Sequence, residues 1–188
     1  MNKQIPELSF VDIEKGDSNS INILSDALED HGFFSITEHG LSNELVDKCY
    51  QLSKQFFNLE YETKNKYSSV GSKGARGYTP KGIETAVGEN VPDQKEFWHH
   101  GPVVDDTFDQ KIPKNIIIEE MPEFNKYYDE LYLELHKIGS RVLSVIALSL
   151  EIDKNFFTPW IEKGNSLLRS IHYPPVDSNL NPHRARAH

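Results

Sequence analysis

The chain is poor in cysteine and in positive charge, and it has no long apolar run. Cys49 is its single cysteine, so an internal disulfide is excluded. Lys and Arg number 20 against 29 Asp and Glu, and the net charge of -9 disfavours binding to nucleic-acid phosphates or anionic lipid. The most apolar stretch, residues 142–150, is far shorter than the roughly 20 residues of a membrane-spanning helix. We therefore expect neither a nucleic-acid partner nor a membrane partner.

The sequence also lacks two features that would have indicated a secreted protein or a zinc hydrolase. Residues 1–6 contain no apolar core of the kind found in secretory signal peptides. Together with the single cysteine, this predicts a protein of the reducing cytoplasm. A zinc hydrolase is disfavoured because no His-Glu-x-x-His motif occurs.

What the sequence does contain is typical of a folded domain. Of its 188 residues 37% are hydrophobic, and ten Phe and eight Tyr are among them, which is enough to form a buried core. No repeat or low-complexity tract divides the chain. Residues 68–76, rich in Gly, Ser and Lys, are the segment most similar to a linker between domains. We interpret them as a mobile loop rather than a domain boundary.

Apolar spacing predicts three elements near the beginning of the chain. A short strand is expected around residues 8–11. A helix is expected over 19–30 because apolar residues recur there at helical steps, with Ser18 or Asn19 as its N-cap. Aromatic and β-branched residues over 33–37 then predict a buried strand.

A second helix should follow, with Ser42 as its N-cap and Leu41 and Val46 as a hydrophobic staple. Its apolar residues fall on one face, formed by Leu45, Cys49, Leu52 and Phe56. Cys49 is therefore interpreted as a core residue and not as a reactive thiol.

The second half of the chain predicts a strand around Phe97 and Trp98, a long helix over 122–150 and a strand over 167–173. The long helix carries an apolar stripe that we interpret as core, formed by Leu131, Leu135, Ile138, Val142, Val145 and Leu148. The run from Asp93 to Glu96 is interpreted as a solvated or salt-bridged structural turn without a catalytic role. These elements predict an α+β layout with too few strands to close a sheet.

Three segments carry a resemblance to a known family. Residues 30–40 contain Gly-Phe-Phe and then Glu-His-Gly, with Glu38 in place of the family's usual Asn. The second segment combines Phe-Phe-Asn-Leu at 56–59, Lys64, Arg-Gly-Tyr-Thr-Pro at 76–80 and Asp-Gln-Lys-Glu at 93–96. The third combines Leu-Arg-Ser-Ile-His-Tyr-Pro-Pro at 168–175 and Arg-Ala-Arg-Ala-His at 184–188. In order and spacing these segments resemble the isopenicillin N synthase-like, 2-oxoglutarate- and Fe(II)-dependent oxygenases.

The resemblance covers nearly the whole chain and implies an α+β fold. Residues 1–120 would form the helical N-terminal region of such an oxygenase. Residues 121–188 would hold the long helix and the first strands of a double-stranded β-helix, or jelly roll, that is only begun here. The two parts are expected to form one structural unit.

The resemblance also assigns roles to three residues. His188 falls on the family's first iron-binding histidine, and Tyr173 on a tyrosine whose hydroxyl meets the 2-oxoglutarate carboxylate. Arg76 falls where some members place an arginine that binds a substrate carboxylate bidentately. Taken alone, these residues also fit simpler interpretations: a surface histidine near a chain end, a strand tyrosine packed beside Pro174, and a solvated loop arginine. The other histidines considered are interpreted as strand or loop residues: His99, His100, His172 and His183.

The departures from the family pattern bear on the same site. Arg186 replaces a usual Gly, and Ile171 stands where many plant members have an Asn that helps to bind 2-oxoglutarate. The chain stops before the iron-binding Asp, the second His and the arginine that binds the distal 2-oxoglutarate carboxylate in most members.

The function implied is that of an oxidoreductase that uses Fe(II), O2 and 2-oxoglutarate to hydroxylate, desaturate or cyclise a small organic molecule. Fe(II) that activates O2 is held by two His and one carboxylate in such enzymes. This chain supplies one of these ligands, so alone it is expected to be inactive. Two alternatives remain open: an Fe(II) oxidase that does not use 2-oxoglutarate, and a non-catalytic fragment or interaction module that binds no metal.

Overall fold

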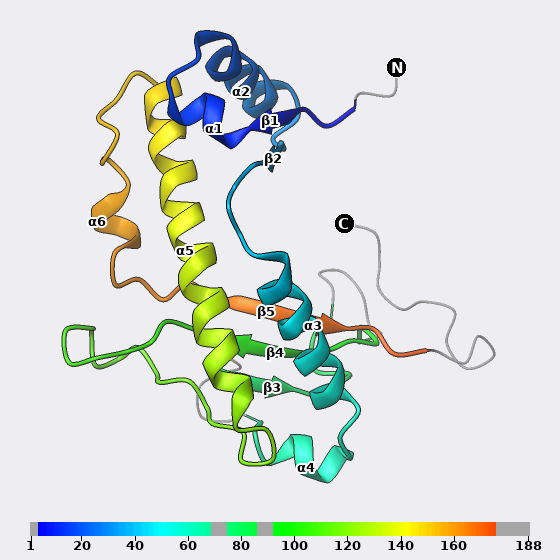
Figure 1. Ribbon diagram of the computed structural model, residues 1–188. Helices are drawn as coiled ribbons and strands as arrows, with labels where there is room; N and C mark the ends of the chain where they lie inside the picture. Colours follow the sequence, from blue (N-terminus) through cyan, green and yellow to red (C-terminus); the bar gives the residue numbers. More distant parts are fainter. Residues whose placement is uncertain (1–3, 69–74, 86–91, 176–188) are drawn as a thin grey trace. The chain divides into compact units, whose positions relative to one another are not determined.

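The computed structural model describes residues 4–68, 75–85 and 92–175 and shows a mixed arrangement of helices and strands (Figure 1). In chain order its elements are β1 Glu7–Ser9, α1 Phe10–Glu14, α2 Ser18–Asp30, β2 Ser35–Thr37, α3 Asn43–Phe57, α4 Tyr61–Asn65, β3 Gly77–Thr79, β4 Glu96–His100, α5 Glu123–Ser149, α6 Thr158–Ile161 and β5 Leu168–His172. The chain divides into two compact units, each made of two separate segments. Unit 1 is Met1–Asn43 with Leu133–Gly164, and unit 2 is Glu44–Tyr132 with Asn165–His188.

Unit 1 is built on a parallel pair of strands, β1 and β2, in which Leu8 lies opposite Ile36. Its buried core consists of Leu8, Phe10, Ile13, Leu24 and Val145. Val145 comes from α5, so the core joins parts of the chain that lie far apart in sequence.

Ser9 both ends β1 and begins α1. Its Oγ accepts a hydrogen bond from the backbone N–H of Asp12 at 3.2 Å, which is the usual arrangement of a helix N-cap. The strand predicted over 8–11 is therefore too long, because Phe10 and Val11 already lie in a helix that the sequence pattern did not predict.

The next two predictions are right in type and differ in detail. The predicted helix is α2, but its N-cap is Asp17, whose carboxylate accepts from the N–H of Ser20 at 2.8 Å. The predicted buried strand is the shorter β2, in which Ser35 and Thr37 are exposed and Ile36 packs against the core. Side chains alternate along a strand and the core packs against one face of this sheet, so of the three residues of β2 only Ile36 is shielded.

Helix α5 is the predicted long helix and contributes to both units. Leu131 and Val145 of its stripe are buried, and Ile138 and Val142 pack against the unit 1 core. The stripe is not core throughout, because Leu135 and Leu148 are 38% and 44% exposed. In the described ranges, no helix combines the length and the apolar character needed to cross a membrane.

Unit 2 is built on an antiparallel sheet in the order β3-β4-β5, with Trp98 opposite both Tyr78 and Ser170. Helix α3 and the first part of α5 lie over one face of this sheet (Figure 1). Phe56 is at the centre of the aromatic core there, with ring contacts to Phe57, Tyr67, Tyr78, Trp98 and Phe124. The rings of Phe57, Tyr78 and Trp98 meet Phe56 edge to face, and such contacts between large rings contribute strongly to the stability of a small core.

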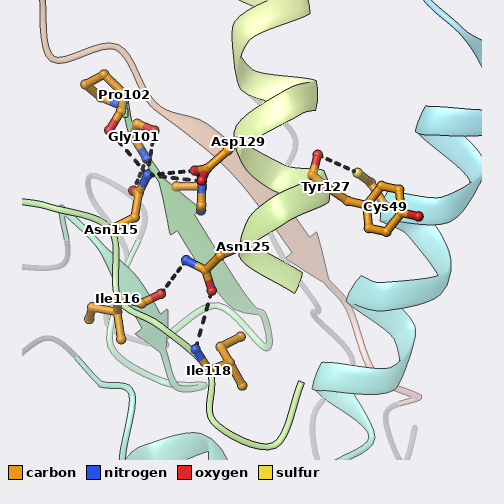
Figure 2. Close-up of polar contacts among 10 residues, drawn as sticks. Cys49, Gly101, Pro102, Asn115, Ile116, Ile118, Asn125, Tyr127 and Asp129 are labelled. Atoms are coloured by element: carbon orange, nitrogen blue, oxygen red, sulfur yellow. Dashed lines mark hydrogen bonds and ion pairs between the residues drawn. The ribbon is translucent and has the colours of Figure 1, made fainter. Parts of the chain in front are cut away.

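Cys49 belongs to the buried face of α3, as predicted. Its Sγ donates to the backbone carbonyl of Tyr127 on α5 at 3.4 Å (Figure 2). Burial raises the pKa of Cys49 to about 11, so its thiolate is scarce at neutral pH. The interpretation of Cys49 as a core residue is confirmed.

Candidate functional site

The two faces of the β3-β4-β5 sheet differ in what covers them. On one face His100 lies 2.6 Å from Asp129 of α5, and Ser170 lies 2.7 Å from the hydroxyl of Tyr128 on the same helix. Because side chains alternate along a strand, every second residue of β4 and β5, counted from His100 and Ser170, points to this face, and the remaining residues point to the opposite face. That second face, called here the open face, carries Phe97, His99, Arg169 and Ile171, and Tyr173, directly after β5, continues the alternation.

The helix-covered face contains a buried carboxylate, Glu96, which is 2% exposed. It accepts hydrogen bonds from Lys64 at 2.8 Å, from the Tyr78 hydroxyl at 2.5 Å and from Nδ1 of His172 at 2.8 Å. Burial by itself would raise the pKa of Glu96, but these three donors outweigh it and hold the pKa below its ordinary value. His172 is held further by stacking on Phe57, at 5.2 Å between ring centroids.

The position of Glu96 differs from the one expected from the sequence. The run from Asp93 to Glu96 was expected to be a solvated or salt-bridged turn, and Lys95 does form ion pairs with Asp93 at 3.0 Å and Glu84 at 2.9 Å. Glu96, however, begins β4 and is buried. Its distant partner on β5 is 76 residues away, and local sequence carries no signal for such a contact.

Asn115 fixes the segment that follows β4. Its Oδ1 accepts from the N–H of Gly101 at 2.7 Å, while its Nδ2 donates to the carbonyls of Gly101 at 3.0 Å and Pro102 at 3.3 Å. The same Nδ2 reaches Asp129 at 3.3 Å, as Figure 2 shows. Farther along, Asn125 bonds the backbone of Ile116 and Ile118 in a similar way. Asn115 thus holds the backbone of Gly101 in place, and Asn125 holds the segment that follows Asn115.

Gly101 in turn lies against Arg76, which is only 1% exposed. Arg76 donates to the carbonyl of Ala75 at 2.6 Å and to Oδ1 of Asn165 at 2.7 Å, and in the described part of the chain its Nε has no acceptor. Burial lowers the pKa of Arg76, although the phenol of Tyr132 opposes this change. The interpretation of Arg76 as a solvated loop residue is wrong, because its guanidinium is buried.

Tyr173 directly follows the last residue of β5 and is 38% exposed. Ile171, the neighbouring residue on the open face, is 45% exposed. The predicted iron ligand His188 lies outside the described residues. Within the ranges that are described, no three His, Cys, Asp or Glu side chains are grouped so that they could hold a metal ion.

Arg169 was missed by the sequence analysis. Its Nε donates to Nε2 of His99 at 2.5 Å, and its guanidinium lies over the ring of Phe97 at 4.4 Å. Its Nη2 is 3.7 Å from Glu84. The signal was present in the sequence, since residues 169, 171 and 173 must share a face if 167–173 is a strand.

Comparison with known proteins gives consistent matches. A family model described as non-haem dioxygenase in morphine synthesis N-terminal matches residues 5–120. A 2-oxoglutarate-Fe(II) type oxidoreductase from Metarhizium rileyi is 30% identical over 168 residues, which is 81% of this chain and 46% of the relative.

Solved structures agree with these sequence matches. A protein from Caulobacter crescentus, described as belonging to the 2OG-Fe(II) oxygenase family, is 36% identical with a TM-score of 0.82 over 93% of this chain and 58% of that one. A Neurospora crassa protein in complex with alpha-KG shares the fold at 22% identity and a TM-score of 0.75, over 94% of this chain and 56% of its own. The chain thus spans about half the length of these relatives.

Proposed function

The chain belongs to the non-haem dioxygenase N-terminal family, and on this premise we propose that it is the N-terminal part of a 2-oxoglutarate- and Fe(II)-dependent oxygenase. The observation that carries the proposal is the match to the Caulobacter crescentus oxygenase-family structure, at 36% identity and a TM-score of 0.82. The names of the sequence relatives support the same cofactors. The substrate would be a small organic molecule, with O2 as co-substrate and the cytoplasm as the location.

The fold proposal extends beyond this chain. The β3-β4-β5 sheet would be the beginning of a jelly roll, with residues 1–120 as the N-terminal region and 121–188 as the start of the core. In support of this, α3 and α5 cover one face of the sheet. On the other face, Ile171 of β5 and Tyr173, which follows β5, remain exposed. Apolar and aromatic side chains left exposed on one face of a sheet are expected where further structure packs.

Three residues would take part in binding. His188 is proposed as an iron ligand, and Tyr173 as a donor to a 2-oxoglutarate carboxylate. Tyr173 fits that role because its side chain is exposed on the open face and a phenol is a good donor to an anion. Bound iron and the oxo acid would supply the oxidising chemistry, while these residues bind and orient the reactants.

Arg76 is proposed to bind a substrate carboxylate. In its support, Arg76 forms no ion pair with any carboxylate of the described chain, and its Nε lacks an acceptor. A buried guanidinium without a counter-ion is costly, and an incoming anion would relieve that cost.

The test is succinate formation from 2-oxoglutarate with Fe(II) and ascorbate. A longer parent protein that holds the remaining ligands is expected to form succinate, and the 188-residue chain by itself is not, because one proposed ligand cannot complete a facial triad. In the parent, His188→Ala should abolish bound iron and succinate, whereas the nearby His183→Ala should retain both. A folded parent that binds no iron would overturn the proposal in favour of a non-catalytic module.

A further inference from the structure

The open face carries a cation whose charge is only partly compensated. Arg169 lies on it with a side chain that is 37% exposed. The contact at Nε is with Nε2 of His99, which must present a lone pair and is therefore a neutral partner. In the described part of the chain, the one carboxylate paired with Arg169 is Glu84, at 3.7 Å. That separation is longer than a hydrogen bond, so the bidentate edge of the guanidinium is not saturated.

The same contacts hold the guanidinium in one orientation. Stacking on Phe97 fixes its plane, and the bond to His99 fixes its Nε edge. Both neighbours are buried, at 3% and 5% exposure, so they form a rigid support. A pre-oriented guanidinium loses less entropy when it binds a planar carboxylate than a mobile one does.

Strand register places Arg169 at a defined end of the sheet. It pairs with His99, and His99 pairs with Gly77, the residue after Arg76. Both arginines therefore belong to the same end, where β3 begins and β5 begins. Tyr173, one residue past the end of β5, lies four residues beyond Arg169, or about 13 Å at the usual rise per residue. An anion at Arg169 is therefore not the carboxylate that Tyr173 would bind.

We propose that Arg169 binds a carboxylate group of the substrate and so selects for anionic substrates. This inference rests on the proposed function, in which Tyr173 on the open face would bind 2-oxoglutarate. Arg169 is the more exposed of the two arginines named at this end, since Arg76 is 1% exposed, and it would bind a carboxylate in addition to any that reaches Arg76. Glu84 occupies the vicinity of the guanidinium and competes with the incoming carboxylate. The half-exposed Ile171 offers an apolar surface beside it, which suits an acid with a hydrocarbon or aromatic body.

Benzoate and benzamide test this site directly, because they match in shape and differ in charge. Titration of the 188-residue chain, followed by NMR of arginine Nε–H resonances, should show benzoate binding at least tenfold more tightly than benzamide. Arg169→Gln should remove that preference, and Arg169→Lys should keep part of it. Lys66→Gln is the charge-matched control, since Lys66 is 63% exposed in the same unit, and it should change nothing. Retention of the preference by folded Arg169→Gln would overturn the proposal.

A second variant keeps the test decisive if Arg169→Gln fails to fold. Glu84→Gln removes the competing carboxylate and should strengthen benzoate binding several-fold, and an unchanged or weaker affinity would refute the inference. The succinate assay on the parent protein is independent of this titration. If the parent protein forms no succinate but the chain prefers benzoate to benzamide, only the enzyme proposal is refuted. If the parent forms succinate but the chain shows no preference for benzoate, only the role of Arg169 is refuted.

Discussion

Oε1 of Glu96 lies 2.8 Å from Nδ1 of His172 and joins the first residue of β4 to the last residue of β5. The other carboxylate oxygen accepts from Lys64 and Tyr78. One buried side chain thus fixes the edge strand immediately before Tyr173. Any role of Tyr173 in binding depends on this link, because it sets where the chain leaves the sheet.

Glu96→Gln should destabilise unit 2 strongly. The amide keeps the shape but leaves the ammonium of Lys64, whose side chain is 9% exposed, without its counter-ion. Breaking a buried pair from one side costs about 3–5 kcal/mol. Urea unfolding should show this loss. The control Glu123→Gln removes an ion pair with Lys48 in which the glutamate side chain is 62% exposed, and it should cost less than about 1 kcal/mol.

Acid should weaken the fold through the same carboxylate. The pKa of Glu96 is lower in the folded chain than its ordinary value of 4.5, so the ionised form favours folding. This contribution is present above about pH 4.5 and is lost as the pH falls through the lowered pKa. The free energy of unfolding, measured against pH, should therefore fall less steeply below pH 4.5 in Glu96→Gln than in the wild type. Equal slopes would show that Glu96 does not carry the acid dependence.

Gly101→Ala should destabilise the chain because its new Cβ would collide with the guanidinium of Arg76. Such overpacking typically costs about 1–3 kcal/mol. In an Arg76→Ala background the collision partner is absent, so the same change should cost much less. A double-mutant cycle in urea should give a coupling energy above about 1 kcal/mol. Additive effects of the two substitutions would contradict the packing of Gly101 on Arg76.

Glu38 adopts a left-handed backbone with φ of 55°, which asparagine tolerates better than glutamate. Its side chain also accepts a hydrogen bond from Ser9 at 2.6 Å, and this contact would mask the backbone effect. In a Ser9→Ala background, Glu38→Asn should therefore raise the thermal midpoint, with a gain of about 0.5–1 kcal/mol. A lower midpoint in that background would mean that backbone strain at Glu38 is negligible.

In the parent protein, Tyr173→Phe should raise the KM for 2-oxoglutarate about fivefold, because one hydroxyl hydrogen bond contributes about 1 kcal/mol. Iron content should not change. Tyr50→Phe is a suitable control, since Tyr50 is 72% exposed on α3. A KM equal to that of the wild type would remove Tyr173 from the cofactor site.

The sequence predicted elements whose signals are local. Periodic apolar residues located both ends of α2 and α5 within one residue, and they indicated α3 and placed its Cys49 in the core. The strand containing Phe97 and Trp98 and the strand before Pro174 were also predicted correctly. In each case the signal is local. The spacing of apolar residues, or a proline that ends the element, lies within the element or within a few residues of it.

Features that depend on distant partners were not predictable in the same way. Nothing near Arg76 signals that Asn165 and Gly101 will enclose it. Likewise the start of α1 depends on Ser9 acting as an N-cap in a segment with strand-like composition. The exposure of Leu135 depends on which tertiary neighbours cover α5. Periodicity states which residues share a face, but not whether that face is covered.

The interleaving of the two units has a consequence for biosynthesis. Leu8 and Ile36 pack with Val145, so the core of unit 1 is incomplete until more than a hundred further residues have been translated. At about 5–20 residues per second this delay is roughly 5–20 s. Unit 2 waits longer still, because β5 is made after α5 and α6. During this interval the nascent chain presents Leu8 and Ile36 of its N-terminal strands to the ribosome surface and to chaperones, and a pause in translation within α5 would prolong that exposure.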